Sequence, residues 1–325
     1  MPEPEPGPFE ALVKIEACGL CGTTDRHIIE GHLPYHPADQ YPALLGHESV
    51  GTVVKVGAKV GKFRIGDRVT RPVAIWPGTQ RAGYYSAWGG FAEYGLVRDC
   101  TAPGAPAPDF HSARQHIVPP SFSIEDAVAA ISIAEVASWM GKLGPLRDAH
   151  VVIGGTGFAA CLMCQCARAS GARSIITLGR TPSKFAWATK NGATHTLLLN
   201  QDTQANVRAI TDGLGAHWFL DAAGHQAVFE QGLTCLRPGG HAAIYGAPDG
   251  CSYRLPLDAV GGEFDVRLIH TADDTFFDEA CRRMADRRLD ADAVRTHVWH
   301  GLESLPEALA DQIAGKVLKG LVRIA

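Results

Sequence analysis

The sequence predicts an α/β protein in two parts, a β-rich first part followed by a parallel sheet covered by helices. Before about residue 120, apolar and β-branched runs are short and interrupted by glycine, which is typical of strands joined by turns. From His150 onward, predicted strands alternate with predicted helices. That alternation is the pattern of a doubly wound parallel sheet. The length of 325 residues suits two domains, each with its own core.

The elements are expected in a definite order along the chain. In the first part the strands are ALVKIEACGL, ESVGTVVKVG, GDRVTRPVAIW and GGFAEYGLV. Two prolines, Pro119 and Pro120, end this part. A helix is then expected in SIEDAVAAISIAEVASWMGKL, with Ser123 as its N-cap. Later strands are expected in HVVIGG, RSIITLG, HTLLL, HWFLDAA, GGHAAIYG, DVRLIHT and LKGLVRIA, with helices between them.

Composition restricts the class of partner and the compartment. The net charge of −4 gives no basic surface for nucleic acid or an anionic membrane. No apolar run approaches the roughly 20 residues that cross a bilayer. The start, MPEPEPGPFE, is acidic and proline-rich and does not have the pattern of a signal peptide. Together with nine cysteines, expected to be reduced thiols, this predicts a cytoplasmic protein.

A glycine loop follows the strand that begins at His150. Its residues fit the G-x-G-x-x-A form of the dinucleotide fingerprint: Gly155, Thr156, Gly157, Phe158, Ala159 and Ala160. The first glycine allows a tight turn, the second lets a pyrophosphate approach the backbone, and the alanine lets the helix pack closely on the sheet. The helix N-terminus then presents free N–H groups to the phosphates. The alternative is an ordinary strand-to-helix turn.

The next strand bears on the choice of cofactor. An NAD site usually has an acid about 20 residues after the loop, bonded to the ribose 2′-hydroxyl. No Asp or Glu occurs between His150 and Gln201. The strand is instead followed by Gly179, Arg180, Thr181, Ser183 and Lys184. Cations and hydroxyls suit a 2′-phosphate, so the sequence predicts NADP(H) in preference to NAD(H). The alternative is that these are solvated charges at a helix start.

A cysteine pair lies near the N-terminus, in ACGLCGTTDRH. Cys18 and Cys21 fit three interpretations: a redox pair, half of a zinc knuckle, or one functional cysteine beside a bystander. The motif alone leaves the three open. The redox interpretation has little support, because no thioredoxin-like context surrounds the pair.

The chain resembles the zinc-dependent alcohol dehydrogenases of the medium-chain dehydrogenase/reductase superfamily, in particular the polyol and secondary-alcohol dehydrogenases. The resemblance covers essentially the whole chain through VKIEACGLCGTTDRHIIEG, PALLGHESVGTVVKVGAKVGKFRIGDRV, GGFAEYGLV, GTGFAA, DAAG, LRPGGHAAIYG and GKVLKGLV. It implies a GroES-like β-barrel catalytic domain over residues 1–118 and 273–325, and a Rossmann NADP-binding domain over residues 119–272. It also implies a homodimer or homotetramer.

The resemblance assigns the cysteines and a metal site. Cys21 matches the catalytic-zinc cysteine of the family, and Cys18 matches a small residue packed nearby. His47 would be the second ligand and Glu135 the third, with Glu48 beside them as an outer or exchangeable ligand. Thiolate, imidazole and carboxylate are all zinc ligands, and three protein ligands leave a fourth position for substrate. The alternative for Glu135 is a polar-face helix residue.

Two departures from the family pattern alter the expected site. The stretch RPVAIWPGTQRAGYYSAWGG has no cysteine where many relatives bind a structural zinc, so one catalytic zinc per chain is predicted. The family usually has an acid three residues after the catalytic cysteine. Here Thr24 occupies that place and Asp25 comes one later, so either a bulge returns Asp25 to the site or the surroundings of the metal are altered.

The resemblance implies reversible alcohol oxidation with hydride transfer to the nicotinamide, the zinc acting as a Lewis acid on the substrate oxygen. Thr23 matches a hydroxyl that passes on the substrate proton, and His27 could carry that proton to solvent. The substrate is expected to be a polyol, a cyclitol or a secondary alcohol. Trp76, Tyr84, Tyr85 and Trp88 suit a hydroxylated substrate or, equally, a subunit interface. The alternative functions are a zinc-free quinone or enoyl reductase, which lacks the Cys–His pair, and a non-catalytic NADPH-binding protein.

Overall fold

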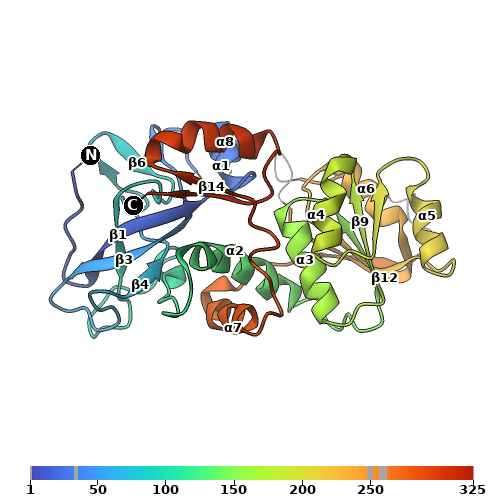
Figure 1. Ribbon diagram of the computed structural model, residues 1–325, viewed down its shortest axis with the longest axis horizontal. Helices are drawn as coiled ribbons and strands as arrows, with labels where there is room; N and C mark the ends of the chain where they lie inside the picture. The colour runs from blue at the N-terminus through green and yellow to red at the C-terminus, as the bar shows by residue number, and fades with distance from the viewer. Residues whose placement is uncertain (1, 33–35, 247–251, 256–261, 325) are drawn as a thin grey trace. The chain divides into compact units, whose positions relative to one another are not determined.

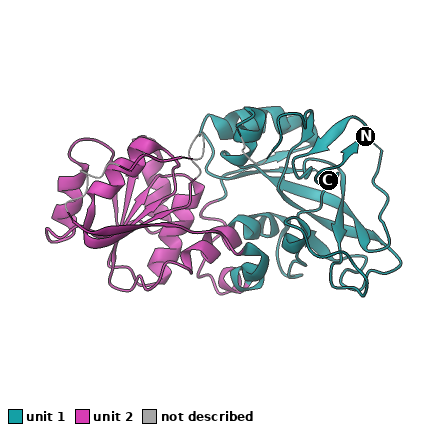
Figure 2. Ribbon diagram, turned by 180° about the vertical axis from the view of Figure 1, so that it is seen from behind, with its two compact units in different colours: residues 1–132, 273–281, 295–325 teal, residues 133–272, 282–294 magenta. Residues whose placement is uncertain are grey.

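The chain folds as two units, each built around its own sheet (Figure 2). The computed structural model describes residues 2–32, 36–246, 252–255 and 262–324. Unit 1 comprises residues 1–132, 273–281 and 295–325, and unit 2 comprises residues 133–272 and 282–294. Relative to the predicted boundaries, unit 1 also takes the start of the helix that begins at Ile124, and unit 2 takes residues 282–294.

Strand β1 (Glu10–Gly19) is the centre of the six-stranded sheet of unit 1 (Figure 1). It pairs antiparallel with β3 (Glu48–Val56), β7 (Tyr94–Arg98) and β15 (Gly320–Arg323). Strand β4 (Arg68–Thr70) extends the sheet beyond β3, and β14 (His297–His300) lies parallel to β15. Seven of the ten β1 positions are apolar or glycine, and side chains on both of its faces are buried, which explains its central place.

The remaining elements of unit 1 are short, as the sequence predicts for this β-rich part. A three-stranded sheet has the order β2 (Ala43–Leu44), β6 (Tyr84–Ser86), β5 (Gln80–Arg81). The helical segments are α1 (Thr24–Ile29), η1 (Ser112–Arg114), η4 (Leu302–Ser304) and α8 (Leu305–Ile313). Helix α7 (Asp273–Ala285) begins in unit 1 and ends in unit 2.

Helix α2 (Ile124–Met140) begins as predicted. The Ser123 hydroxyl accepts a hydrogen bond from the backbone N–H of Asp126 at 3.0 Å, which satisfies one of the free donors of the first turn. The two prolines before it keep the preceding chain extended. No helix in the described ranges is long and apolar enough to cross a membrane.

Unit 2 contains a parallel sheet of six strands, in agreement with the predicted fold class (Figure 1). The strands, in spatial order, are β10 (His195–Leu198), β9 (Ser174–Gly179), β8 (His150–Gly154), β11 (Ala216–Asp221), β12 (Leu236–Ile244) and β13 (Phe264–Leu268). In chain order this is 3-2-1-4-5-6, the Rossmann arrangement, whose order reverses at β8. The carboxyl end of β8 is therefore the expected ligand position of this unit.

Buried apolar residues from the strands and helices form the core of unit 2. Strands β8, β9, β11 and β12 contribute Val152, Ile176, Phe219 and Ala242, and all four are fully buried. The helical segments are α3 (Phe158–Ala169), η2 (Pro182–Lys184), α4 (Phe185–Lys190), α5 (Thr203–Ile210) and α6 (Gln226–Thr234). This core fixes the strand ends, and with them the loops that follow β8 and β9.

Candidate metal centre and cofactor loop

The two cysteines of the N-terminal motif lie in opposite environments. Cys18 lies on strand β1 and is fully buried beside Leu20 and Phe91. Burial raises the pKa of the Cys18 thiol well above its ordinary value. Cys21 lies in the turn after β1 and is only partly buried, and its sulfur accepts the backbone N–H of Thr24 at 3.4 Å. Cys18 is thus a packing residue and Cys21 the more accessible thiol.

Strand pairing brings Cys21 to His47 and Glu48. Gly19, at the end of β1, pairs with Glu48, at the start of β3. Cys21, which follows Gly19, and His47, which precedes Glu48, are therefore neighbours. Gly46 has a φ of +106° and lies against the backbone of Phe91, where a Cβ atom would be 2.5 Å from the Phe91 nitrogen. The glycine therefore allows the sharp turn that delivers His47 to this point.

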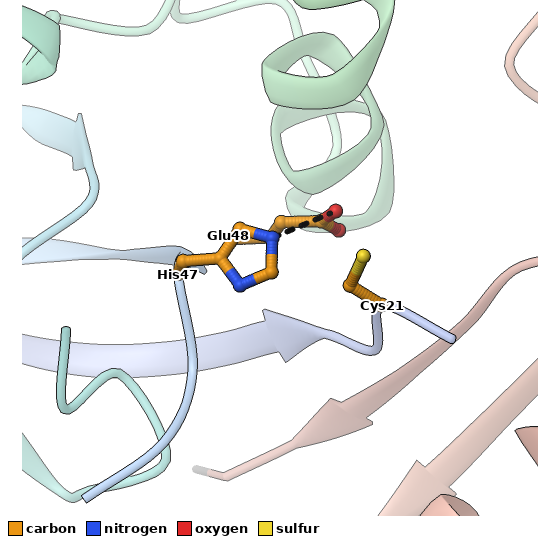
Figure 3. A group of neighbouring side chains, drawn as sticks. All are labelled: Cys21, His47 and Glu48. Atoms are coloured by element: carbon orange, nitrogen blue, oxygen red, sulfur yellow. Dashed lines mark ion pairs between the residues drawn. The ribbon is translucent and has the colours of Figure 1, made fainter. Parts of the chain in front are cut away.

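The side chains of Cys21, His47 and Glu48 converge (Figure 3). One ligand atom from each lies within 4.8 Å of the others, and His47 Nε2 is 3.7 Å from Glu48 Oε1. In the described ranges this is the one group of three or more histidine, cysteine or acidic side chains with such spacing. A partly buried thiol with a buried imidazole and a buried carboxylate, all facing one point, is a donor set that fits zinc.

Neighbouring charges favour the ionised form of each side chain, so Cys21 and Glu48 are favoured as anions, whereas His47 must lose a proton before its nitrogen can bind a metal. Burial raises the pKa of Cys21, but the hydrogen bond and charge of His47 outweigh it, and the pKa of the thiol is lowered. Burial lowers the pKa of His47, but Asp25 and Cys21 raise it well above its ordinary value. Burial also raises the pKa of Glu48, and the buried ammonium of Lys319, its ion-pair partner, reverses that shift, so the carboxyl pKa is lowered. The sequence reasoning did not assign Lys319 a role.

Asp25 lies beside the converging group of Cys21, His47 and Glu48. It is fully buried, and its Oδ2 accepts the backbone N–H of Cys21 at 2.9 Å. Its Oδ1 lies 3.4 Å from His47 Nδ1. Helix α1 begins at Thr24, so the additional residue is accommodated in its first turn and Asp25 points back to the ligands. Asp25, not Thr24, thus takes the place beside His47.

The other predicted residues of the site are placed differently. Thr23 is exposed at the N-cap of α1, and His27 is buried on α1 with its Nε2 3.1 Å from the Arg26 guanidinium. Glu135 is partly buried on α2, in the stretch that belongs to unit 2. It is outside the converging group of Cys21, His47 and Glu48, and its role as third ligand stays a prediction.

The glycine loop follows β8 at the carboxyl edge of the unit 2 sheet. Gly155 has a φ of +122°, a conformation that favours glycine. Gly157 is the N-cap of α3, and Phe158 and Ala159 form its first turn. The buried Thr156 lies against Gly179, where β9 ends. The loop and the end of β9 are therefore adjacent, as a bound dinucleotide requires.

The basic residues after β9 are available to a ligand. Arg180 and Thr181 are exposed, and Lys184 is partly exposed with its ammonium 5.9 Å from the centre of the Trp187 ring. Asp221, at the end of β11, is buried and accepts backbone N–H groups from Ala223 and Gly224. It shapes the turn after β11.

Comparison with known proteins places this fold and site. Residues 7–106 match the alcohol dehydrogenase GroES-like domain family, and residues 160–286 match the zinc-binding dehydrogenase family. The chain is 30% identical to a sorbitol dehydrogenase of Bacillus subtilis, over 79% of this chain and 73% of that one. It is 30% identical to an alcohol dehydrogenase of Cupriavidus necator, over 92% of this chain and 87% of that one.

A solved structure agrees with these relatives. It is a putative zinc-binding dehydrogenase of Sinorhizobium meliloti bound to NADP, 26% identical, with a TM-score of 0.79 over 99% of this chain and 94% of that one. The class defined by the fold is thus a two-part dehydrogenase with a GroES-like and a Rossmann component. The chain belongs to the zinc-dependent alcohol dehydrogenase family of the medium-chain dehydrogenase/reductase superfamily, and is an oxidoreductase acting on CH–OH groups.

Replacing Asp25 by Asn is expected to weaken zinc binding about 10- to 100-fold, the usual cost of losing a carboxylate beside a histidine ligand. Asparagine retains a hydrogen bond to the Cys21 N–H but loses the charge that faces His47 Nδ1. Competition with a chromophoric chelator measures the affinity. Asp39→Asn, an exposed acid that follows α1, is the control and should leave it unchanged. Equal affinities for both variants would show that Asp25 has no part in orienting the ligand.

Proposed function

We propose that this enzyme interconverts an alcohol and its ketone with NADP(H) as the hydride carrier, and that its substrate is a polyol, a cyclitol or a secondary alcohol. The convergence of Cys21, His47 and Glu48 is the observation that carries the proposal. The relatives named sorbitol dehydrogenase and alcohol dehydrogenase support this substrate range. A homodimer or homotetramer is part of the proposal, and sedimentation would test it.

One zinc per chain would be held by Cys21, His47 and Glu135, with Glu48 as an outer or exchangeable ligand. When bound, zinc supplies a Lewis acid that polarises the substrate oxygen and lowers the pKa of the alcohol. Asp25 holds His47 in position through its charge and fixes the Cys21 backbone through a hydrogen bond. Thr23 would receive the substrate proton on its hydroxyl, and His27 would take that proton towards solvent.

The cofactor would bind along the carboxyl edge of the unit 2 sheet. The loop from Gly155 to Ala159 would receive the pyrophosphate on its backbone N–H groups. Arg180, Thr181 and Lys184 would contact the 2′-phosphate, since they follow the end of β9 and their side chains are exposed or partly exposed. Gly179 precedes them, and no acid occupies the position that a 2′-hydroxyl would require.

A screen of alcohols and ketones with NADP⁺ and NADPH, together with elemental analysis, tests the function. Protein purified without chelator should contain about one zinc per chain and oxidise at least one polyol or secondary alcohol. Zinc-free protein that reduces quinones or enones would replace the proposal by the reductase alternative. Cofactor binding with no turnover on any substrate would favour a binding protein.

Replacing both Arg180 and Lys184 by Ala is expected to lower kcat/KM for NADP⁺ at least about 100-fold and to leave that for NAD⁺ within about threefold. The basis is that charge-assisted contacts to a phosphate are each worth about 1.5–3 kcal/mol, and 1.4 kcal/mol is a factor of ten. Initial rates with each cofactor at a fixed alcohol concentration give the ratio. Arg173→Ala is the control, because Arg173 is an exposed cation at the opposite end of β9, paired with Asp212. Equal losses with the two cofactors would contradict the assigned 2′-phosphate site.

A further inference from the structure

The indole ring of Trp88 lies beside His47, a member of the converging group of Cys21, His47 and Glu48. Trp88 follows β6 in unit 1, and its ring centre is 5.3 Å from that of His47, with the planes inclined at 51°. On its other side the ring of His111 is 5.4 Å away, inclined at 49°. Trp88 also packs against the buried cluster of Ile28 and Ala87. The indole is thus held between a predicted metal ligand and a second imidazole.

Two features of Trp88 are unfavourable for folding. Its backbone has a φ of +70°, in the left-handed region that bulky side chains rarely adopt. Its Nε1–H is buried, and no described residue accepts a hydrogen bond from it. A buried indole N–H usually has a partner, and leaving one unpaired is costly. Strain and an unpaired donor are retained most often at functional sites.

The surroundings of Trp88 indicate the kind of acceptor. Burial, with the nearby charges of Arg71 and Arg114, lowers the pKa of His111 to about 4, so this imidazole is uncharged at neutral pH. Beyond it, the ring of Phe110 is packed edge-on against His111. The Arg114 guanidinium that covers the Phe110 ring is paired with Asp273, so the indole N–H has an uncharged imidazole beside it and a neutralised cation beyond. These surroundings suit a neutral oxygen such as a hydroxyl better than a carboxylate or phosphate.

We propose that Trp88 is a specificity-determining residue whose indole N–H donates a hydrogen bond to a second hydroxyl of the substrate, close to the hydroxyl that reacts at the Cys21–His47 group. This rests on the proposed function and narrows it: the substrate class is an alcohol with a neighbouring hydroxyl, a diol or polyol. A substrate without that oxygen leaves the indole N–H unpaired, so its kcat/KM should be much lower.

The test compares Trp88→Phe with wild type on matched substrates. Each diol or polyol that the enzyme oxidises is paired with the analogue lacking the neighbouring hydroxyl, and 2,3-butanediol with 2-butanol is the simplest pair. Phenylalanine retains an aromatic ring but removes the N–H donor. We expect wild type to favour the diol at least about tenfold in kcat/KM. Trp88→Phe should lose that preference because its kcat/KM for the diol falls, whereas its kcat/KM for the mono-alcohol changes little. Zinc content should not change.

Trp218→Phe is the matched control. Trp218 is a buried tryptophan on β11 of unit 2, and its ring is covered by the Arg267 guanidinium, 5.0 Å from the ring centre. A preference lost in Trp88→Phe and kept in Trp218→Phe supports the proposal. Equal losses on both substrates, or a wild type that favours the mono-alcohol, overturn it while leaving the alcohol dehydrogenase function in place. The wild-type ratio decides this even if the variant does not fold. Absence of any alcohol oxidation would instead overturn the proposed function, and the inference with it.

Discussion

Replacing Cys21 by Ser is expected to remove zinc from the enzyme and to lower kcat/KM for alcohol oxidation at least about a thousandfold. Lewis-acid stabilisation is worth several kcal/mol, and each 1.36 kcal/mol is a factor of ten in rate. The His47 imidazole lowers the pKa of the Cys21 thiol and so favours the thiolate that zinc binds. A serine hydroxyl at the same position is a far poorer anion. Elemental analysis and steady-state rates with NADP⁺ measure the two effects.

Cys18→Ala is the control for this prediction. Cys18 is fully buried beside Leu20 and Phe91, so its loss should reduce stability by about 1 kcal/mol and leave zinc content unchanged. Zinc retained by Cys21→Ser with activity near wild type would show that the metal is held elsewhere. Zinc lost from both variants would indicate a site shared by the two cysteines, the zinc-knuckle interpretation of the motif.

The fold could be predicted because its signals are local. Apolar runs broken by glycine mark the strands of unit 1, and the alternation after His150 follows the order of unit 2 closely. The cap of α2 at Ser123 could also be predicted, because capping depends on residues within one turn. Register and element order follow from patterns of this kind wherever one face of a strand or helix is buried.

The position of Asp25 could not be settled from spacing. The sequence has one residue more than the family pattern between Cys21 and the acid, and only the start of α1 at Thr24 decides where that residue is accommodated. A helix turn advances the chain less than extended backbone does, so Asp25 still reaches His47 Nδ1. The family pattern gave the residue type, and the local backbone gave its place.

Contacts between distant parts of the chain were beyond prediction. Lys319 pairs with Glu48, and His111 packs on Trp88, although in neither case does the sequence indicate a connection. The first contact depends on the sheet order of unit 1, which places β15 next to β1 and β1 next to β3, and the second joins two loop residues 23 positions apart. They nonetheless determine the charge of Glu48 and the environment of Trp88, and so affect the chemistry of the site.

Replacing Glu135 and Glu48 separately by Gln distinguishes the two candidate third ligands. The Glu48 carboxylate already pairs with the buried ammonium of Lys319, which lowers its pKa and draws its charge away from a metal. We therefore expect Glu135→Gln to lose most of its zinc and at least about 10- to 100-fold in kcat/KM. Glu48→Gln should retain zinc but lose about 3 kcal/mol of stability, since it leaves a buried ammonium without its counter-charge.

Zinc content and the free energy of unfolding together decide between the carboxylates. Glu125→Gln is the control, because Glu125 lies on the same helix as Glu135 and pairs with Arg323 near the surface. This variant should leave the zinc content unchanged. Zinc lost from Glu48→Gln and kept by Glu135→Gln would make Glu48 the third ligand, in the group that already converges on one point. In that case zinc and the Lys319 ammonium would share the charge of one carboxylate, because Lys319 pairs with Oε2 and Oε1 lies on the side of His47. Zinc affinity in a Lys319→Met variant would then rise, whereas with Glu135 as the ligand it should stay unchanged.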